Sequence, residues 1–263
     1  MSELEQTGKL SIVATPIGNM EDITLRALRT LRECDVIYAE DTRVIAKVLS
    51  KYEIKKPLQR LDAATEGKKA QEVVARLMAG EHVVFVSDAG TPGVSDPGSR
   101  LVASVRESSR HLLVQSSSGL PHSSSDKLRL RPLVSEDAAS IVIEAIPGPS
   151  ALTTLLSIAG IDATQFTFVG FLPHKKGRQT ALKKLSTSTI PVVLYESPHR
   201  ILKLLAELAV VLPLCRITIG RELTKMHEEV LSGTPIELAD SLKGRGADRG
   251  EFVLIVEAEF SGW

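Results

Sequence analysis

The sequence predicts an α/β protein with two sheet-containing domains. Short apolar segments of strand length alternate with longer segments whose apolar residues recur at helical spacing. Three loops rich in glycine and proline, over 15–19, 87–93 and 146–151, each follow a strand-like segment. Glycine permits close backbone approach and proline stiffens a turn, so these loops suit the ligand-binding edge of an open α/β sheet, at the carboxyl ends of its strands.

Regular alternation of strands and helices in the first half of the chain indicates a mainly parallel sheet. Strands are expected over 10–14, 36–39 and 82–86, and helices over 22–32, 42–50, 66–78 and 96–106. The first helix is predicted from Ile23, Ala27 and Leu31, which recur at helical spacing. Asp96 is suited to cap the last helix, with Pro97 at its first position.

The second half alternates again but ends in a hairpin-like pattern, which predicts a mixed sheet. Strands are expected over 141–146, 166–170, 192–195, 216–220 and 252–257, and helices over 150–159, 179–185, 200–211 and 236–242. A further segment, 228–232, belongs to the hairpin-like ending.

A serine-rich segment, 108–140, separates the two halves. It contains serine runs at 116–118 and 123–125 and a stretch in which basic residues alternate with leucine from Lys127 to Arg131. This composition favours an inserted loop, with a hairpin strand as the alternative. The expected domains are therefore 8–107 and 141–260, the second beginning with the strand and Pro-Gly-Pro loop that join it to the first.

Composition indicates an ordinary globular protein and excludes several classes. The chain is 43% apolar and 24% charged, and its 32 Lys and Arg balance 32 Asp and Glu, so no global basic field attracts a polyanion. Cys34 and Cys215 lie far apart without metal-ligand spacing, so we expect no metal site and a reduced, cytoplasmic setting. No apolar run approaches a membrane span of roughly 18 residues, and the first residues do not resemble a signal peptide.

The glycine loops lack both common phosphate-binding patterns. Neither G-x-x-x-x-G-K-[ST] nor G-x-G-x-x-G occurs, and Asp88 and Asp96 beside the loops would repel phosphate. These acids suit a ligand that is cationic, zwitterionic or rich in hydroxyl donors. S-adenosylmethionine has these features, although glycine and proline also occur together in simple turns.

Several short motifs occur in the order found in one known family. They are 15–24, 39–43, 87–92, 96–98, 147–151, 170–173, 195–200, 221–225 and 250–251. Together they resemble the ribosomal RNA small subunit methyltransferase I family, a branch of the tetrapyrrole methylase superfamily. The resemblance covers nearly everything except the insertion and both tails.

The resemblance implies a fold, a cofactor and a substrate. It implies two α/β/α domains of the class III methyltransferase type, with S-adenosylmethionine held in a cleft between them, and a homodimer. It also implies methyl transfer to the 2′-hydroxyl of a cytidine in the decoding region of 16S ribosomal RNA, free or in the small subunit. By position, the cofactor wall comprises Pro16, Ile17, Gly18, Asn19, Asp88, Ala89, Gly90, Thr91, Pro147, Gly148 and Ser150.

A 2′-hydroxyl is a poor nucleophile, so a base, or a cation that stabilises the developing alkoxide, is expected beside it. The catalytic candidates are Asp41, Glu196, Glu222 and Lys225, with Glu40 as a further charged residue at a strand end. Each could instead form a structural ion pair, for example Arg43 with Glu40 or Arg221 with Glu196. The candidate RNA contacts are Arg43, Lys175, Lys176, Arg178, Arg200 and Arg221.

The chain also departs from the family pattern. Ala64 and Thr65 stand where the family usually has a His-Asn pair, and the run from Asp248 to Glu251 is less basic than usual. The insertion could cover a cleft, contact RNA or act as a spacer. Two other functions stay open: methylation of a tetrapyrrole ring carbon, and a non-catalytic role as a ribosome-assembly binding module.

Overall fold

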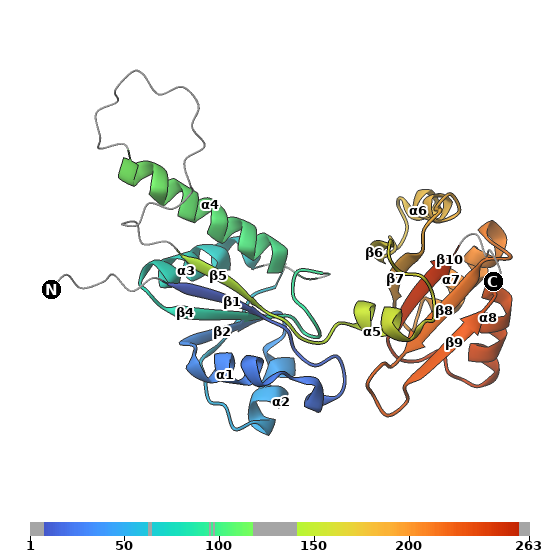
Figure 1. Ribbon diagram of the computed structural model, residues 1–263, viewed down its shortest axis with the longest axis horizontal. Coiled ribbons are helices and arrows are strands. Elements are labelled where there is room, and N and C mark those ends of the chain that lie inside the picture. Colours follow the sequence, from blue (N-terminus) through green and yellow to red (C-terminus); the bar gives the residue numbers. More distant parts are fainter. Residues whose placement is uncertain (1–7, 63–64, 95, 97, 118–140, 258–263) are drawn as a thin grey trace, which may run out of the picture. The chain divides into compact units, whose positions relative to one another are not determined.

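The computed structural model describes residues 8–62, 65–94, 96, 98–117 and 141–257, and the chain divides into two compact units (Figure 1). Unit 1 comprises Met1–Pro16 and Asp22–Gly148, and unit 2 comprises Ile17–Glu21 and Pro149–Trp263. The short segment Ile17–Glu21 thus belongs to unit 2, although its sequence neighbours on both sides belong to unit 1.

Unit 1 is built on a parallel sheet of five strands in the order β3-β2-β4-β1-β5. The strands are β1 (Lys9–Val13), β2 (Val36–Ala39), β3 (Leu58–Arg60), β4 (His82–Val86) and β5 (Val142–Ile146). Every neighbouring pair is parallel, which confirms the predicted mainly parallel sheet. Strand β5 is expected from the sequence to begin the second domain, but it pairs with β1 in unit 1, and unit 2 takes up the chain again only at Pro149. The three-residue strand β3 was not predicted, because so short a segment shows no periodicity.

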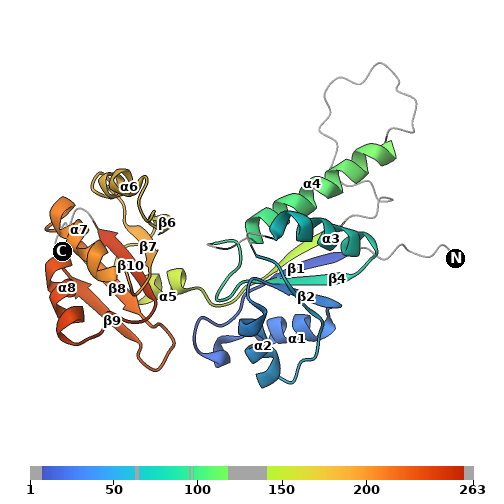
Figure 2. The same ribbon diagram turned by 180° about the vertical axis from the view of Figure 1, so that it is seen from behind.

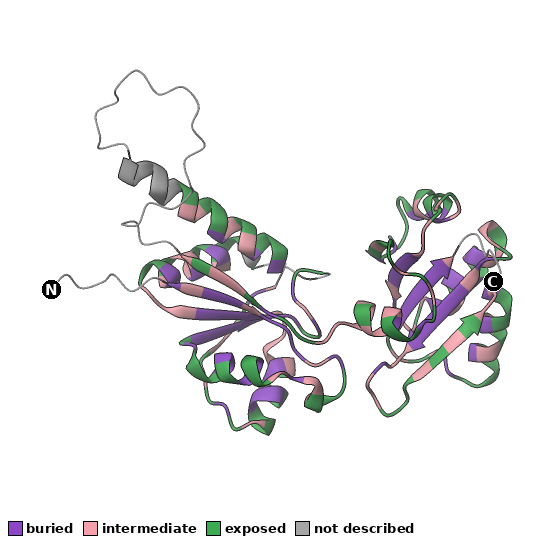
Figure 3. Ribbon diagram, in the orientation of Figure 1, coloured by how far each residue is buried: buried purple, intermediate pink, exposed green. Residues whose placement is uncertain are grey.

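Helices cover both faces of this sheet (Figures 1 and 2). They are α1 (Leu25–Glu33), α2 (Thr42–Lys51), α3 (Glu66–Met78) and α4 (Gly98–Ser117). On one face Tyr38 and Phe85 of the strands pack with Val73 of α3 and Leu101 of α4. Figure 3 shows that the central strands β1, β2 and β4 are mostly buried between partly exposed helices, as an α/β/α arrangement requires, while the edge strands β3 and β5 are more exposed.

Helix α4 differs from its predicted bounds. It begins at Gly98, whose N–H donates to the Asp96 carboxylate at 2.8 Å, and it continues to Ser117. The insertion is expected from residue 108, but residues 108–117 are helical instead. The Ser108 and Ser109 hydroxyls donate to the Ser104 and Val105 carbonyls one turn earlier, so the helix accommodates both serines. The remaining part, 118–140, lies outside the described residues.

Unit 2 contains a mixed sheet, as predicted, and the structure shows that its strand order is β6-β7-β10-β8-β9. Its strands are β6 (Thr167–Phe171), β7 (Val192–Glu196), β8 (Arg216–Arg221), β9 (Glu229–Gly233) and β10 (Phe252–Glu257). Strands β6 and β7 are parallel, and the other neighbours are antiparallel. The register of β6 shifts between Phe168 and Gly170, which marks a β-bulge.

The two faces of this second sheet are covered unequally. Helices α6 (Arg178–Leu185), α7 (Ile201–Val211) and α8 (Pro235–Gly244) supply leucines to the larger apolar cluster, among them Leu182, Leu204 and Leu238. On the opposite face Leu155 of α5 (Ala151–Ile158) and Ile17 pack against Val193, Val253 and Ile255. Across the described ranges, no helix combines the length and apolar character that a membrane span requires.

Candidate functional site

The carboxyl edge of the unit 1 sheet gathers several predicted cofactor residues. Thr15 and Gly90 exchange backbone hydrogen bonds, each with an N···O distance of 3.0 Å. Gly148 lies against β1, since a Cβ atom at this position would be 2.9 Å from the Ala14 Cβ. Because β4, β1 and β5 are adjacent and parallel, Pro16, the loop 88–91 and the pair Pro147 and Gly148 follow strands at one edge.

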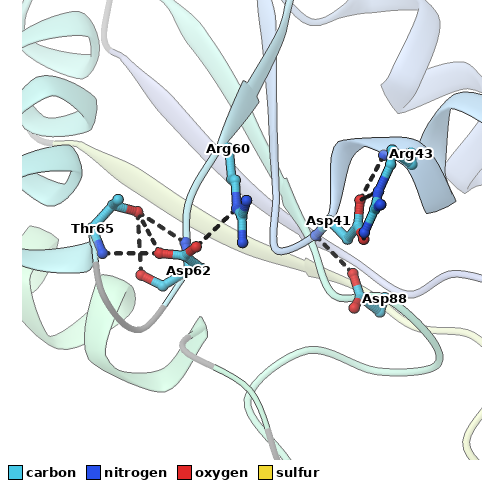
Figure 4. A network of polar contacts seen from close by, with 6 residues as sticks. All are labelled: Asp41, Arg43, Arg60, Asp62, Thr65 and Asp88. Atoms are coloured by element: carbon cyan, nitrogen blue, oxygen red, sulfur yellow. Dashed lines mark hydrogen bonds and ion pairs between the residues drawn. The ribbon is translucent and has the colours of Figure 1, made fainter.

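Acidic residues occupy the same edge (Figure 4). The Asp41 backbone N–H donates to Asp88 Oδ1 at 2.8 Å, so the loops after β2 and β4 are joined directly. Asp41 also caps α2 and pairs with Arg43, with Nη2 and Oδ2 at 2.5 Å. Arg43 therefore pairs with Asp41 and not with Glu40, the partner considered from sequence.

Two carboxyl groups at this edge have shifted pKa values of opposite sign. Hydrogen bonds from Arg43 lower the pKa of Asp41 to about 2. Burial raises the pKa of Glu40, and the nearby charges of Asp88, Asp96 and Asp62 raise it further. This concentration of negative charge suits a cationic ligand and disfavours phosphate.

The departure from the family pattern near residue 65 has a local structural use. The Thr65 hydroxyl donates to Asp62 Oδ1 at 2.8 Å, and its backbone N–H donates to the same oxygen at 2.9 Å (Figure 4). Asp62 in turn pairs with Arg60 at 2.8 Å. Thr65 thus fixes the turn between β3 and α3, while position 64 lies outside the described residues.

In unit 2, a loop after β8 packs against the segment Ile17–Glu21. The Asn19 backbone N–H donates to Thr224 Oγ1 at 3.0 Å. A Cβ atom at Gly18 would be 2.7 Å from the same oxygen, so only glycine fits this close approach. The structure therefore brings the predicted cofactor residues Gly18 and Asn19 beside the loop that carries Glu222 and Lys225.

Lys225 is held between two carboxylates in this loop. Its Nζ atom lies 2.9 Å from Glu222 Oε1 and 3.0 Å from Glu251 Oε2. Burial works to lower the pKa of Lys225, but the two carboxylates outweigh it and the pKa is raised. Burial likewise works to raise the pKa of Glu222, but hydrogen bonds from the Glu251 N–H and Lys225 lower it. Lys225 is therefore a fixed cation and Glu222 a weak base.

The backbone of the same loop is strained. Glu222 and Thr224 have φ angles of +49° and +67°, in the left-handed region that non-glycine residues rarely adopt. The Thr224 N–H donates to the Glu228 carboxylate, and the Glu222 N–H donates to the Glu251 carbonyl at 2.9 Å. Such strain often marks a functional site. The roles of Thr224 and Glu228 were missed, because neither the φ angle nor these contacts leave a signal in the sequence.

Glu196 lies in a second charged cluster, which is buried. Its side chain is 0% exposed and pairs with Arg200, with Oε1 and Nε at 3.2 Å. Arg178 pairs with Glu207 at 2.6 Å and lies 3.8 Å from Glu196. Arg200 and Arg178 also donate to the carbonyls of Leu172 and Pro173, at 2.6 and 3.2 Å. The two arginines thus hold the loop that follows β6.

These positions correct part of the predicted RNA surface. Arg178 is 4% exposed and its guanidinium is occupied by Glu207 and Pro173, so it has no surface to offer a phosphate. Arg200 is mostly buried in the same cluster. Arg221 donates to the Arg249 carbonyl at 2.7 Å and pairs with Glu229 rather than Glu196. Arg43, Lys175 and Lys176 are exposed, as a direct RNA contact requires.

The other predicted cofactor residues of unit 2 are Ile17 and Ser150. Ile17 is buried in the apolar cluster beside α5. Ser150 precedes α5 and its side chain interacts with Tyr195, whose pKa burial raises. Within the ranges that the structure covers, no group of three His, Cys, Asp or Glu residues is arranged to hold a metal ion.

Comparison with known proteins identifies the family. Residues 9–125 and 128–239 match the family described as Tetrapyrrole (Corrin/Porphyrin) Methylases. The Ribosomal RNA small subunit methyltransferase I of Thermotoga maritima is 40% identical over 227 residues, covering 86% of this chain and 88% of that protein. The protein of the same name from Borrelia garinii subsp. bavariensis is 39% identical over 255 residues, covering 96% and 100%.

The chain belongs to the ribosomal RNA small subunit methyltransferase I family. This confirms the resemblance drawn from its motifs.

Solved structures confirm the fold of this methyltransferase family. A diphthine synthase structure has a TM-score of 0.65 at 15% identity, covering 94% of this chain and 89% of its own. A uroporphyrin-III C-methyl transferase from Thermus thermophilus, complexed with S-adenyl homocysteine, has a TM-score of 0.57 at 18% identity, covering 95% and 97%. The predicted tetrapyrrole methylase fold is therefore confirmed.

Proposed function

We propose that this protein transfers a methyl group from S-adenosylmethionine to the 2′-hydroxyl of a cytidine in the decoding region of 16S ribosomal RNA. The name shared by its relatives supports the substrate class. The observation that carries the proposal is the cluster of Lys225, Glu222 and Glu251, packed against Gly18 and Asn19 by a strained loop.

The residues at the loops fit this cofactor. The acidic edge around Asp88 suits its positive charge, and Gly148 and Gly18 let their loops pack closely on Ala14 and on Lys225, which fixes the backbone of both loops. When bound, the cofactor supplies a methyl group on a sulfonium sulfur, a strong electrophile. We assign its binding to Pro16, Ile17, Gly18, Asn19, Asp88, Ala89, Gly90, Thr91, Pro147, Gly148 and Ser150.

Charged residues of the chain orient and activate the 2′-hydroxyl group of the RNA substrate. Because the pKa of Lys225 is raised, this side chain stays protonated and stabilises negative charge that develops on the attacking oxygen. Glu222 and Glu251 orient it. Asp41, with a pKa of about 2, is a poor base and instead positions Arg43 at the substrate side. Glu196 acts as a positioning residue for the loop after β6 through Arg200.

Exposed basic residues supply the contacts to RNA. Lys175 and Lys176 are available for phosphates, Arg43 presents its exposed guanidinium to the RNA substrate beside Asp41, and Arg200 and Arg221 act indirectly by fixing loops. The proposal also includes a homodimer that works in the cytoplasm on 16S RNA or the small subunit.

Transfer of labelled methyl from S-adenosylmethionine tests the proposal. Unmethylated small subunits, naked 16S RNA and a porphyrinoid are each incubated with the protein, and labelled RNA is digested to locate the nucleoside. Label at a cytidine 2′-oxygen supports the proposal. Label in the porphyrinoid supports a tetrapyrrole methylase, and RNA binding without transfer supports a non-catalytic binding module.

Lys225→Met sharpens the same assay. We expect its single-turnover rate to fall about 100-fold or more, since removing one group that stabilises an oxyanion has an effect of this size. Lys243→Met is the control, because it removes one positive charge from the exposed last turn of α8, and we expect it to leave the rate unchanged. An unchanged rate in Lys225→Met, with cofactor binding intact, removes Lys225 from the site.

A further inference from the structure

An exposed aromatic ring lies at the carboxyl end of β6, which is an edge strand of the unit 2 sheet. Phe171 is 53% exposed, so a large apolar surface stays in contact with water. Its ring centroid lies 5.7 Å from that of Tyr195, with a 59° angle between the planes. Phe168 contacts Tyr195 as well, at 5.1 Å and 69°. Phe171 is thus supported on one side and open on another.

The β-bulge at Val169 creates this arrangement. In a regular strand, residues three apart point to opposite faces of the sheet. Here Phe168 pairs with Val193 and Phe171 pairs with Tyr195, so the shift in register places both phenylalanines on the face that carries Val193 and Tyr195. Bulges commonly re-aim a side chain in this way next to functional sites.

The chain after Phe171 is fixed by the buried arginines. Arg200 and Arg178 hold the carbonyls of Leu172 and Pro173. The loop then presents two exposed cations, Lys175 and Lys176, four and five residues beyond the ring. An open aromatic ring and exposed cations on one short segment are the two components with which proteins bind single-stranded nucleic acid.

We propose that Phe171 stacks on an unpaired base of the RNA substrate, while Lys175 and Lys176 bind the neighbouring phosphates. This inference rests on the proposed function and adds a surface that positions the RNA substrate. The two lysines favour a base of RNA over the adenine of S-adenosylmethionine, because that cofactor is itself positively charged and the lysines would repel it. RNA recognition generally targets unpaired bases that can stack on aromatic side chains.

The first test separates RNA binding from chemistry. Phe171→Leu keeps apolar bulk but removes the aromatic face, so we expect the KM for small subunits to rise about tenfold or more. The kcat and the affinity for S-adenosylhomocysteine stay unchanged, and Phe171→Tyr restores the KM. Phe166→Leu, at an exposed phenylalanine just before β6, is the matched control and leaves all three unchanged. An unchanged KM in Phe171→Leu overturns the proposal.

The second test reports stacking directly. Trp263 is the single tryptophan, so Trp263→Phe gives a silent background in which Phe171→Trp is the reporter. We expect a single-stranded 16S fragment to quench its fluorescence, and Phe166→Trp in the same background to respond weakly. Quenching by S-adenosylhomocysteine instead of RNA, or by neither, overturns the proposal. If the unmodified protein methylates RNA in the same experiments, such a result rejects the stacking surface and leaves the proposed function standing.

Discussion

The two units use charge at their strand ends in opposite ways. In unit 1 the loops after β2 and β4 carry acids, and the ion pair between Asp41 and Arg43 is largely open to water, with Arg43 87% exposed. In unit 2 the arginines near β6 and β7 are buried with Glu196 and Glu207, and the lysines remain at the surface. The buried charge of the arginine cluster therefore serves the structure of unit 2, while the exposed charges of Arg43, Lys175 and Lys176 are available to ligands.

The largest effect is expected from breaking the buried cluster of unit 2. Arg178→Met removes the buried guanidinium that pairs with Glu207 and lies near Glu196. Because the carboxylates then lose a cation inside the protein, the free energy of unfolding should fall by about 3 to 5 kcal/mol. Urea unfolding followed by circular dichroism measures this loss. Lys183→Met, on the exposed side of the same helix, should change stability by less than about 0.5 kcal/mol. A similar small change in both variants would contradict the distinction between buried arginines and surface lysines.

A smaller loss is expected where backbone approaches backbone closely. In Gly18→Ala the new methyl group would be 2.7 Å from Thr224 Oγ1 and 3.1 Å from the Leu223 carbonyl, so the loop must move. We expect a loss of about 1 to 3 kcal/mol in stability and weaker binding of S-adenosylhomocysteine. Calorimetry measures both. Gly67→Ala in α3 meets no atom within 4 Å and should be neutral or stabilising by up to about 1 kcal/mol; equal effects at the two positions would refute the argument.

The open ion pair of unit 1 should appear as a pH dependence. The pKa of Asp41 is lowered from 3.8 to about 2 in the folded protein. Its contribution to stability is therefore complete above the unfolded value of 3.8 and is lost as the pH falls through about 2. Asp41→Asn keeps a good helix cap while removing the charge, so thermal unfolding should depend less on pH across this window.

Asp240→Asn, on the exposed side of α8, is the matched loss of charge for that experiment. It should leave the slope of melting temperature against pH as it is in the unmodified protein. If Asp41→Asn leaves the slope between pH 4 and 2 unaltered as well, the pairing with Arg43 contributes nothing to stability.

Sequence patterns predicted what depends on periodicity and could not predict what depends on distant contacts. The strands β2 and β4 and the helix α3 have the predicted bounds, because buried apolar runs and helical spacing are local. The burial of Arg178 could not be predicted, since it depends on Glu207, 29 residues away in the sequence. The packing of Thr224 on Asn19 spans 205 residues. Sequence motifs therefore predicted which residues belong to the candidate site, but they could not tell the buried ones, such as Arg178, from the exposed ones, such as Lys175.

The smallest effect is expected from relieving backbone strain at two residues with positive φ angles, Glu53 at the end of a helix and Thr224 in the candidate site. Glu53 has a φ of +55° at the end of α2, where Ile54 N–H bonds the Leu49 carbonyl at 2.9 Å and Glu53 N–H bonds the Ser50 carbonyl at 3.3 Å. This is a helix ending that prefers glycine, so Glu53→Gly should stabilise the protein by up to about 1 kcal/mol. Thr224→Gly relieves a φ of +67° but removes the oxygen that accepts the Asn19 N–H. We therefore expect a higher melting temperature in the first variant, and no gain with weaker S-adenosylhomocysteine binding in the second. If both variants raise the melting temperature equally and bind S-adenosylhomocysteine equally well, Thr224 lies in an ordinary turn. Its loop is then not part of the cofactor site.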